Sequence, residues 1–179
     1  MRVLVVGSGG REHALAWAIS ASPGVGKVWT APGNPGTQEV GTNAALDPLD
    51  FSSISSFCRN ESVDLVVVGP ENPLSAGLAD FLKERDIPVF GPVKAGARLE
   101  ASKSAAKEFM VRNGLPHPEF ASFERAEEAV EYIRKRQGPW VIKADGLAFG
   151  KGVIITEDFD EAVLTGRQEN RNRRICRGH

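Results

Sequence analysis

The chain of 179 residues contains few of the residue types that mark metal sites, disulfide frameworks or membrane spans. Its two cysteines, Cys58 and Cys176, are far apart and match neither a zinc-binding spacing nor a redox pair, so we expect both to be reduced thiols. No apolar run approaches the roughly 18 residues that a membrane helix needs. Val3–Val6 is also too short to be the core of a signal peptide. These absences predict a cytoplasmic protein.

An excess of charge of one sign is also missing. Lysine and arginine number 22, aspartate and glutamate 23, and the net charge is −1. This balance provides no bulk attraction for nucleic acid or for anionic lipid, so neither is expected as a partner. Hydrophobic residues make up 41% and charged residues 25% of the chain, as is typical of a globular protein.

Short apolar runs recur along the first half of the chain: VLVV at 3, KVWTA at 27, DLVVVG at 64 and PVFGP at 88. They are apolar at nearly every position, which is typical of parallel strands covered on both faces. Helix-like segments separate them, and in the first of these Ala14, Leu15, Ala18 and Ile19 share a face. We predict an α/β, Rossmann-like N-terminal domain with a parallel sheet over residues 1–100.

The pattern changes from about residue 101. Ser102 is a plausible N-cap for a helix that ends before Gly114, and ERAEEAVEYIRKRQ forms a second helix. WVIKA and GVIIT follow as a hairpin-like pair around a glycine loop. Residues 101–163 therefore read as a small α+β subdomain. Apolar periodicity is lost in residues 164–179, which are predicted to be a disordered tail foreign to the domain that precedes it.

The opening VLVVGSGGREHA matches a dinucleotide-binding fingerprint only in part. Gly7 and Gly9 occupy the first two glycine positions, but the third falls on Glu12, which adds a negative charge. A ribose-binding acid should follow about 20 residues later, yet none occurs there before Glu39. Both departures disfavour NAD and FAD, and with them a nicotinamide oxidoreductase.

The same turn suits a single phosphate. Backbone amides of Ser8, Gly9 and Gly10 at the start of a helix, with Arg11 beside them, make an anion site. The alternative is a turn that only lets the strand enter the helix without strain. Two more polar loops, APGNPGT and GPENPL, follow the second and third runs, and ligands of open α/β sheets collect at those strand ends. A small sugar phosphate is therefore the expected ligand.

VIKADGLAFGKGV indicates a second anion site. Lys143 lies in an apolar strand, where burial is unfavourable unless it meets an anion; the alternative is an edge residue that reaches water. Lys151 lies among Gly146, Gly150 and Gly152, in a loop able to fold over a phosphate chain. The spacing is not that of a Walker loop, and ATP is the predicted ligand.

Six ordered motifs carry a family resemblance: VLVVGSGGREHALAW, APGNPGT, DLVVVGPENPLSAGLAD, VFGP, LEASKSAAKEFM and VIKADGLAFGKGV. Together they closely resemble the phosphoribosylamine–glycine ligase (glycinamide ribonucleotide synthetase) family of the ATP-grasp superfamily, over residues 1–163. The resemblance implies a step of purine synthesis in which ATP phosphorylates glycine and 5-phosphoribosylamine displaces the phosphate. It also implies that residues 101–163 begin an incomplete ATP-grasp domain.

The resemblance further implies two sets of site residues. The phosphoribosylamine pocket would contain Gly9, Gly10, Arg11, Glu12, Asn34, Gly36, Thr37, Gly69, Pro70 and Glu71. The ATP site would contain Lys103, Lys143, Gly146, Gly150, Lys151 and Gly152. Catalytic residues and the acidic ligands of Mg²⁺ or Mn²⁺ are expected in a missing C-terminal part. We therefore predict that this chain has little or no activity by itself, and we also expect a monomer. The alternative is a non-catalytic sugar-phosphate-binding or nucleotide-binding module that acts beside a partner.

Overall fold

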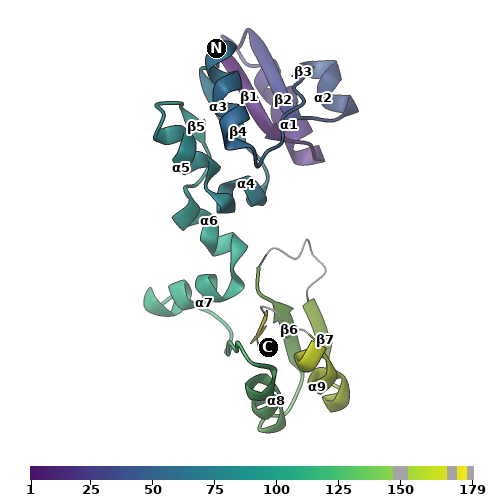
Figure 1. Ribbon diagram of the computed structural model, residues 1–179. Helices are drawn as coiled ribbons and strands as arrows, with labels where there is room; N and C mark the ends of the chain where they lie inside the picture. The colour runs from purple at the N-terminus through teal and green to yellow at the C-terminus, as the bar shows by residue number, and fades with distance from the viewer. Residues whose placement is uncertain (147–152, 169–172, 177–179) are drawn as a thin grey trace. The chain divides into compact units, whose positions relative to one another are not determined.

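A computed structural model describes residues 1–146, 153–168 and 173–176 (Figure 1). The chain divides into two compact units, Met1–Ala97 and Arg98–His179. In the described residues, no helix is long and apolar enough to cross a membrane.

The first unit is built on a five-stranded parallel sheet with the order β3-β2-β1-β4-β5, which confirms the predicted parallel α/β fold (Figure 1). Each of the four apolar runs forms a strand, and the sequence analysis missed only the short β3. The strands are β1 (Arg2–Gly7), β2 (Lys27–Pro32), β3 (Thr42–Asn43), β4 (Leu65–Val68) and β5 (Val89–Phe90). Strand order reverses between β1 and β4, and this is where open α/β sheets bind ligands.

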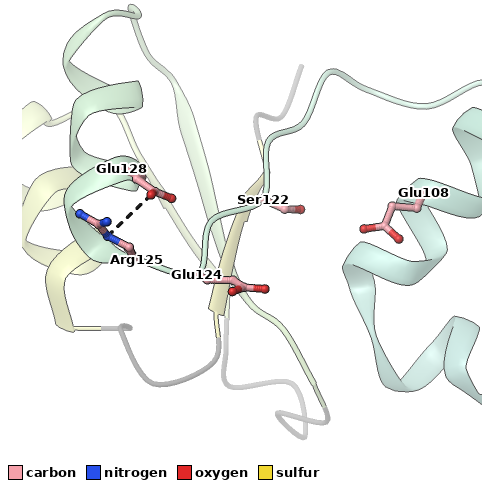
Figure 2. Close-up of a pocket in the computed structure, with 5 residues that line it drawn as sticks. All are labelled: Glu108, Ser122, Glu124, Arg125 and Glu128. Atoms are coloured by element: carbon pink, nitrogen blue, oxygen red, sulfur yellow. Dashed lines mark ion pairs between the residues drawn. The ribbon is translucent and has the colours of Figure 1, made fainter.

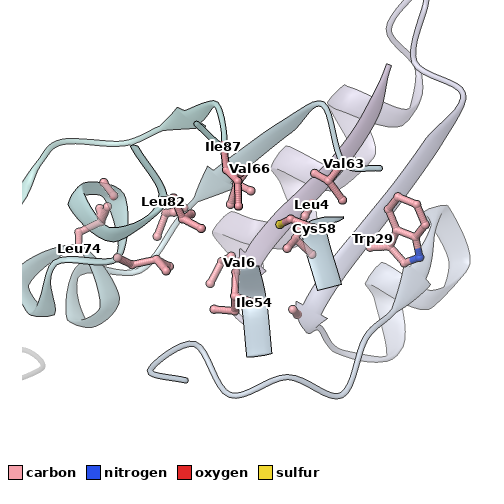
Figure 3. Packing of buried hydrophobic residues seen from close by; sticks show 14 of the residues in the cluster. Leu4, Val6, Trp29, Ile54, Cys58, Val63, Val66, Leu74, Leu82 and Ile87 are labelled. Atoms are coloured by element: carbon pink, nitrogen blue, oxygen red, sulfur yellow. The ribbon is translucent and has the colours of Figure 1, made fainter. Parts of the chain in front are cut away.

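Helices cover both faces of this sheet. Leu4 and Val6 pack with α3 and α5 on one face (Figure 3), whereas Val3 and Val5 pack with Ala16 of α1 on the other. Side chains of a strand alternate between the faces of a sheet, so an unbroken apolar run supplies both cores. The helices are α1 (Gly10–Ser20), α2 (Pro35–Val40), α3 (Phe51–Asn60), α4 (Glu71–Ala76), α5 (Leu78–Lys83) and α6 (Lys94–Ala101).

The second unit contains an antiparallel sheet with the order β7-β6-β8. Trp140 and Ile142 of β6 pack with Ile133 of α8 and Ala162 of α9. The hairpin-like pair predicted around the glycine loop is thus present as β6 and β7. The elements are α7 (Lys103–Arg112), α8 (Ala126–Arg134), β6 (Trp140–Ala144), β7 (Val153–Thr156), α9 (Phe159–Gln168) and β8 (Arg173–Cys176).

The disordered tail predicted for residues 164–179 requires a correction. Helix α9 continues to Gln168, and Thr165 lies on its buried side. Strand β8 then pairs with β6 through the register Val141 to Cys176. The physical reason is that pairing with the edge of β6 satisfies backbone groups whatever side chains the strand carries, so loss of apolar periodicity did not exclude a strand.

Candidate functional site

The turn between β1 and α1 places backbone N–H groups at the carboxyl end of β1, in the middle of the sheet. The first helical hydrogen bond of α1 runs from His13 N–H to the Gly9 carbonyl, at 3.0 Å. The N–H groups of Gly10, Arg11 and Glu12 therefore precede the hydrogen-bonded part of the helix. They add to the partial positive charge of the helix terminus. Because β1 lies between β2 and β4, this terminus is placed at the point where strand order reverses.

Glu12 lies inside this turn. The residue is 5% exposed, and its Oε2 accepts a hydrogen bond of 2.7 Å from Gly9 N–H. A Cβ built on Gly69 would lie 2.2 Å from Glu12 Oε1, and one on Gly7 would lie 2.4 Å from Glu12 Cγ. The side chain thus fills the space between the ends of β1 and β4. Glu12 and Gly9, both predicted to lie near the ligand, are joined by this hydrogen bond.

Arg11 extends from the same turn toward the end of β4. Its Nη1 donates to the Gly69 carbonyl at 3.0 Å and to Glu71 Oε1 at 3.1 Å, and Nη2 donates to the same carboxylate oxygen at 3.2 Å. The Arg11 side chain is 62% exposed. The three hydrogen bonds orient the guanidinium, and its exposure keeps it accessible to an anion. The ion pair itself contributes little to stability, because it is exposed.

Glu71 is the first residue of α4, and the pKa of its carboxyl is lowered. The largest cause is a hydrogen bond from its own backbone N–H; the Arg11 side chain also lowers the pKa, against the opposing effect of partial burial. Glu71 therefore remains ionised at neutral pH, and this charge suits contact with an amine or a hydroxyl. Pro70, also predicted in this pocket, is the N-cap residue of α4.

The APGNPGT loop is tied to the β1–α1 turn by Asn34. Its Oδ1 accepts from Thr37 N–H at 3.0 Å and caps α2, while its Nδ2 donates to the Ser8 carbonyl at 2.9 Å. Thr37 is 0% exposed, and its hydroxyl donates to Asn43 Oδ1 at 2.7 Å. Thr37 was predicted to contact the ligand; the structure gives it the role of holding the loop.

Gly36 of the same loop lies against α1. A Cβ added to it would lie 2.3 Å from Cε1 of the His13 ring. His13 and Asn43 are thus part of the site's framework, although the sequence analysis missed both. The adjacency of His13 to Arg11 and Glu12 was an available signal, whereas nothing in the sequence linked Asn43 to Asn34.

Three residues of the predicted ATP site, Lys103, Lys143 and Gly146, lie among the described residues. Lys103, the first residue of α7, donates from Nζ to the Gly146 carbonyl at 2.9 Å. Lys143 is half-buried in β6, opposite Val153 of β7. Gly150, Lys151 and Gly152 lie outside the described residues.

Asp145, missed by the sequence analysis, joins the start of the glycine loop to the start of α7. Its Oδ2 accepts from Ser104 Oγ at 2.7 Å and from Ser102 Oγ at 3.1 Å. Burial alone would raise the pKa of the carboxyl. The hydrogen bonds from Ser104, Ser102 and the Gly146 backbone outweigh burial, so the pKa is lowered.

We expect Asp145→Asn to weaken the anchoring of α7. Loss of the charge-assisted bonds should reduce amide-exchange protection at Ser104 and Ala105 about tenfold at pH 7, or about 1.4 kcal/mol. Because the pKa of Asp145 is lower in the folded chain, its carboxylate stabilises the fold at pH values above the unfolded pKa of about 3.9. This stabilisation is lost as the pH falls through the folded pKa. The difference between parent and variant should therefore shrink toward pH 3.

Hydrogen exchange followed by NMR measures this prediction. Asp160→Asn is the matched control, because Asp160 is an exposed aspartate in the first turn of α9. A difference between parent and Asp145→Asn that stays constant from pH 7 to pH 3 would show that the ionised carboxylate is not the acceptor.

The second unit also contains a pocket of about 390 Å³ that includes none of the predicted ATP residues. It is lined by Glu108, Ser122, Glu124, Arg125 and Glu128. Figure 2 shows Glu108 on one side and the pair Arg125–Glu128 on the other, whose Nε and Oε1 atoms are 3.6 Å apart. Three carboxylates beside one guanidinium disfavour a polyphosphate ligand.

Comparison with known families matches both units. Residues 1–100 match the family described as phosphoribosylglycinamide synthetase, N domain. The chain belongs to the phosphoribosylglycinamide synthetase family. Residues 101–169 match the ATP-grasp (A) domain of phosphoribosylglycinamide synthetase, beyond the boundary predicted at residue 163.

Individual relatives agree with this assignment. A phosphoribosylamine–glycine ligase of Rhizobium meliloti (strain 1021) is 51% identical over 162 residues, which are 90% of this chain and 38% of that protein. The crystal structure of a phosphoribosylamine–glycine ligase from Thermotoga maritima aligns with a TM-score of 0.79 and 36% identity, over 100% of this chain and 44% of that one. The chain thus spans less than half the length of these phosphoribosylglycinamide synthetase relatives.

A more distant structure shares the fold alone. The biotin carboxylase domain of 2-oxoglutarate carboxylase from Hydrogenobacter thermophilus, solved with the magnesium salt of ADP and with bicarbonate, aligns with a TM-score of 0.73 at 16% identity. The alignment covers 99% of this chain and 44% of that one. The fold of this phosphoribosylglycinamide synthetase chain is therefore shared beyond the family.

Proposed function

We propose that this chain carries the 5-phosphoribosylamine-binding domain and the first part of the ATP-grasp domain of a phosphoribosylamine–glycine ligase, acting in purine synthesis. The observation that supports this most strongly is the placement of Arg11. Its guanidinium is oriented by the Gly69 carbonyl and by Glu71, beside the N-terminus of α1. This combination offers two kinds of donor to one phosphate.

The other residues of the pocket would then act on the sugar. Glu71, ionised and paired with Arg11, would accept a hydrogen bond from the amine or from a ribose hydroxyl. Asn34 and Thr37 would hold the APGNPGT loop against the β1–α1 turn, so that Gly36 and Gly10 line the walls. The framework is fixed by hydrogen bonds before the ligand arrives, which lowers the entropy lost on binding.

ATP would supply the phosphoryl group that activates the carboxylate of glycine. Lys103 and Lys143 are the described cations that would hold its phosphates, and Gly146 begins the loop that would cover them. The Lys103 bond to the Gly146 carbonyl places an ammonium group at the base of that loop, which fits a phosphate-binding role. Mg²⁺ or Mn²⁺ as the metal, a monomeric state and a cytoplasmic location stay predictions.

The test is titration of the full chain with ribose 5-phosphate, in which a hydroxyl replaces the amine of phosphoribosylamine. Arg11→Ala should raise the dissociation constant about 10- to 100-fold, because charge-assisted hydrogen bonds to phosphate contribute about 1.5–3 kcal/mol. Isothermal titration calorimetry gives the constants.

Arg59→Ala is the matched control for this measurement. Arg59 is exposed in the last turn of α3. This turn leads into the start of β4, whereas the proposed phosphate site lies at the carboxyl ends of the strands. Its loss should leave the constant within about twofold of the parent. Equal constants for the Arg11 and Arg59 variants would rule out the proposed phosphate site.

A further inference from the structure

Three glycines converge on the side chain of Glu12. A Cβ on Gly7, Gly9 or Gly69 would lie at 2.4, 3.0 or 2.2 Å from the nearest Glu12 atom. Two of them belong to the β1–α1 turn and the third follows β4, although more than 50 residues separate them in the sequence. A buried carboxylate thus occupies the crevice between β1 and β4, and the backbone is kept free of side chains around it.

The N-terminus of α1, beside this carboxylate, is where a diphosphate would have to lie. Ligands of open α/β sheets bind at the point where strand order reverses, and the pyrophosphate of a dinucleotide lies there at the helix N-terminus, in a motif whose third glycine allows close helix–strand packing. Here Glu12 is at the third glycine's position, and its carboxylate is held in place by Gly9 N–H at 2.7 Å. Gly10 and Arg11 remain as donors for one phosphate.

We propose that Glu12 is a specificity-determining residue: its fixed negative charge admits a sugar monophosphate and rejects a diphosphate at the same turn. The inference rests on the proposed function in that it assumes a sugar phosphate binds at Gly10 and Arg11. Its physical basis is that a second phosphate at the same helix N-terminus would lie beside the like charge of a carboxylate that is 5% exposed. Glu12 also supports the turn, so the test must separate charge from structure.

Glu12→Gln makes this separation, because the amide oxygen still accepts from Gly9 N–H while the charge is removed. The probes are ribose 5-phosphate and ADP-ribose, which presents a ribose through a diphosphate. Binding is followed by the NMR signals of the Gly10 and Arg11 amides, so that a ligand on the second unit does not register. The measured quantity is the ratio of the two dissociation constants.

We expect Glu12→Gln to improve ADP-ribose binding relative to ribose 5-phosphate at least tenfold, with the ribose 5-phosphate constant within about threefold of the parent. An unchanged ratio in a folded Glu12→Gln chain would overturn the proposal. Glu12→Asp is the second variant: it keeps the charge but shortens the side chain, so ADP-ribose should still be rejected. Gain of ADP-ribose binding by Glu12→Asp would show that bulk, not charge, excludes the diphosphate.

The two proposals fail in different ways. A parent chain that binds no ribose 5-phosphate at Gly10 and Arg11 refutes the proposed function, and the inference about Glu12 falls with it. A parent that binds ribose 5-phosphate, with the ratio unchanged in Glu12→Gln, supports the proposed function and overturns the inference about Glu12.

Discussion

Gly69→Ala is expected to lower the free energy of unfolding by about 2–3 kcal/mol, as overpacking of a filled interior does. Its Cβ would lie 2.2 Å from Glu12 Oε1 and 2.6 Å from Glu12 Cγ. Glu12 has no easy movement away, because it is 5% exposed and its carboxylate is bound to Gly9 N–H. Displacing it would also disturb the Gly69 carbonyl that orients Arg11, so affinity for ribose 5-phosphate should fall at least tenfold.

Gly10→Ala is the matched control for stability. Gly10 has no positive φ, as Gly69 has none, and a Cβ on Gly10 would meet nothing within 4 Å. In the first turn of a helix alanine is the better helix former, so this change should be neutral or slightly stabilising. Urea unfolding of both variants measures the difference. Equal stabilities would mean that Glu12 does not fill the space beside Gly69.

Gly33→Ala is expected to have the second large effect, a loss of about 2–5 kcal/mol. Gly33 follows β2, and its N–H donates to the Gly7 carbonyl at 3.1 Å. Its φ of +75° costs a residue with a Cβ about 1–2 kcal/mol. The added Cβ would also lie 2.2 Å from Asn43 Oδ1, which accepts from Thr37, and this overlap should cost about 1–3 kcal/mol more.

Gly24→Ala separates the two causes. Gly24 has a similar φ of +83°, but a Cβ there would meet nothing within 4 Å. Urea unfolding should therefore show a loss of only about 1–2 kcal/mol for Gly24→Ala. The remainder of the Gly33→Ala effect measures the packing of Asn43 and Thr37 beneath the APGNPGT loop. Identical losses at the two positions would contradict that packing.

The runs of consecutive apolar residues predicted the parallel sheet, because buried parallel strands are apolar on both faces, as Val3–Val6 are. Strand β3 was missed because two polar residues, Thr42 and Asn43, form it only by pairing with the edge of β2. No local signal distinguishes such a pair from a loop.

The buried face of α1 was predicted only in part, for a related reason. Apolar spacing selected Ala14, Leu15, Ala18 and Ile19. Leu15 and Ile19 do pack against the core, but Ala14 and Ala18 are exposed, and the buried residues of α1 are Glu12 and Ala16. A carboxylate is buried here because Gly69, distant in sequence, leaves room for it and Gly9 binds it. Propensity and periodicity do not contain that information.

Motif order selected residues that the fold brings together, but it did not predict the contacts of each one. Arg11 and Glu71 do meet, but Thr37 turned out to be internal to its loop. Asp145 was overlooked because its partners, Ser102 and Ser104, lie about forty residues earlier in the chain. Roles that depend on a long-range hydrogen bond are set by the fold.

The most direct test of the central claim, that the β1–α1 turn binds a sugar phosphate, is a two-dimensional ¹H–¹⁵N NMR titration of the chain with ribose 5-phosphate. The account predicts saturable shifts at the amides of Gly10 and Arg11 and at those of Gly69 and Glu71, the residues around the Arg11 guanidinium. Shifts confined to residues of the second unit, or none at all at millimolar ligand, would contradict it.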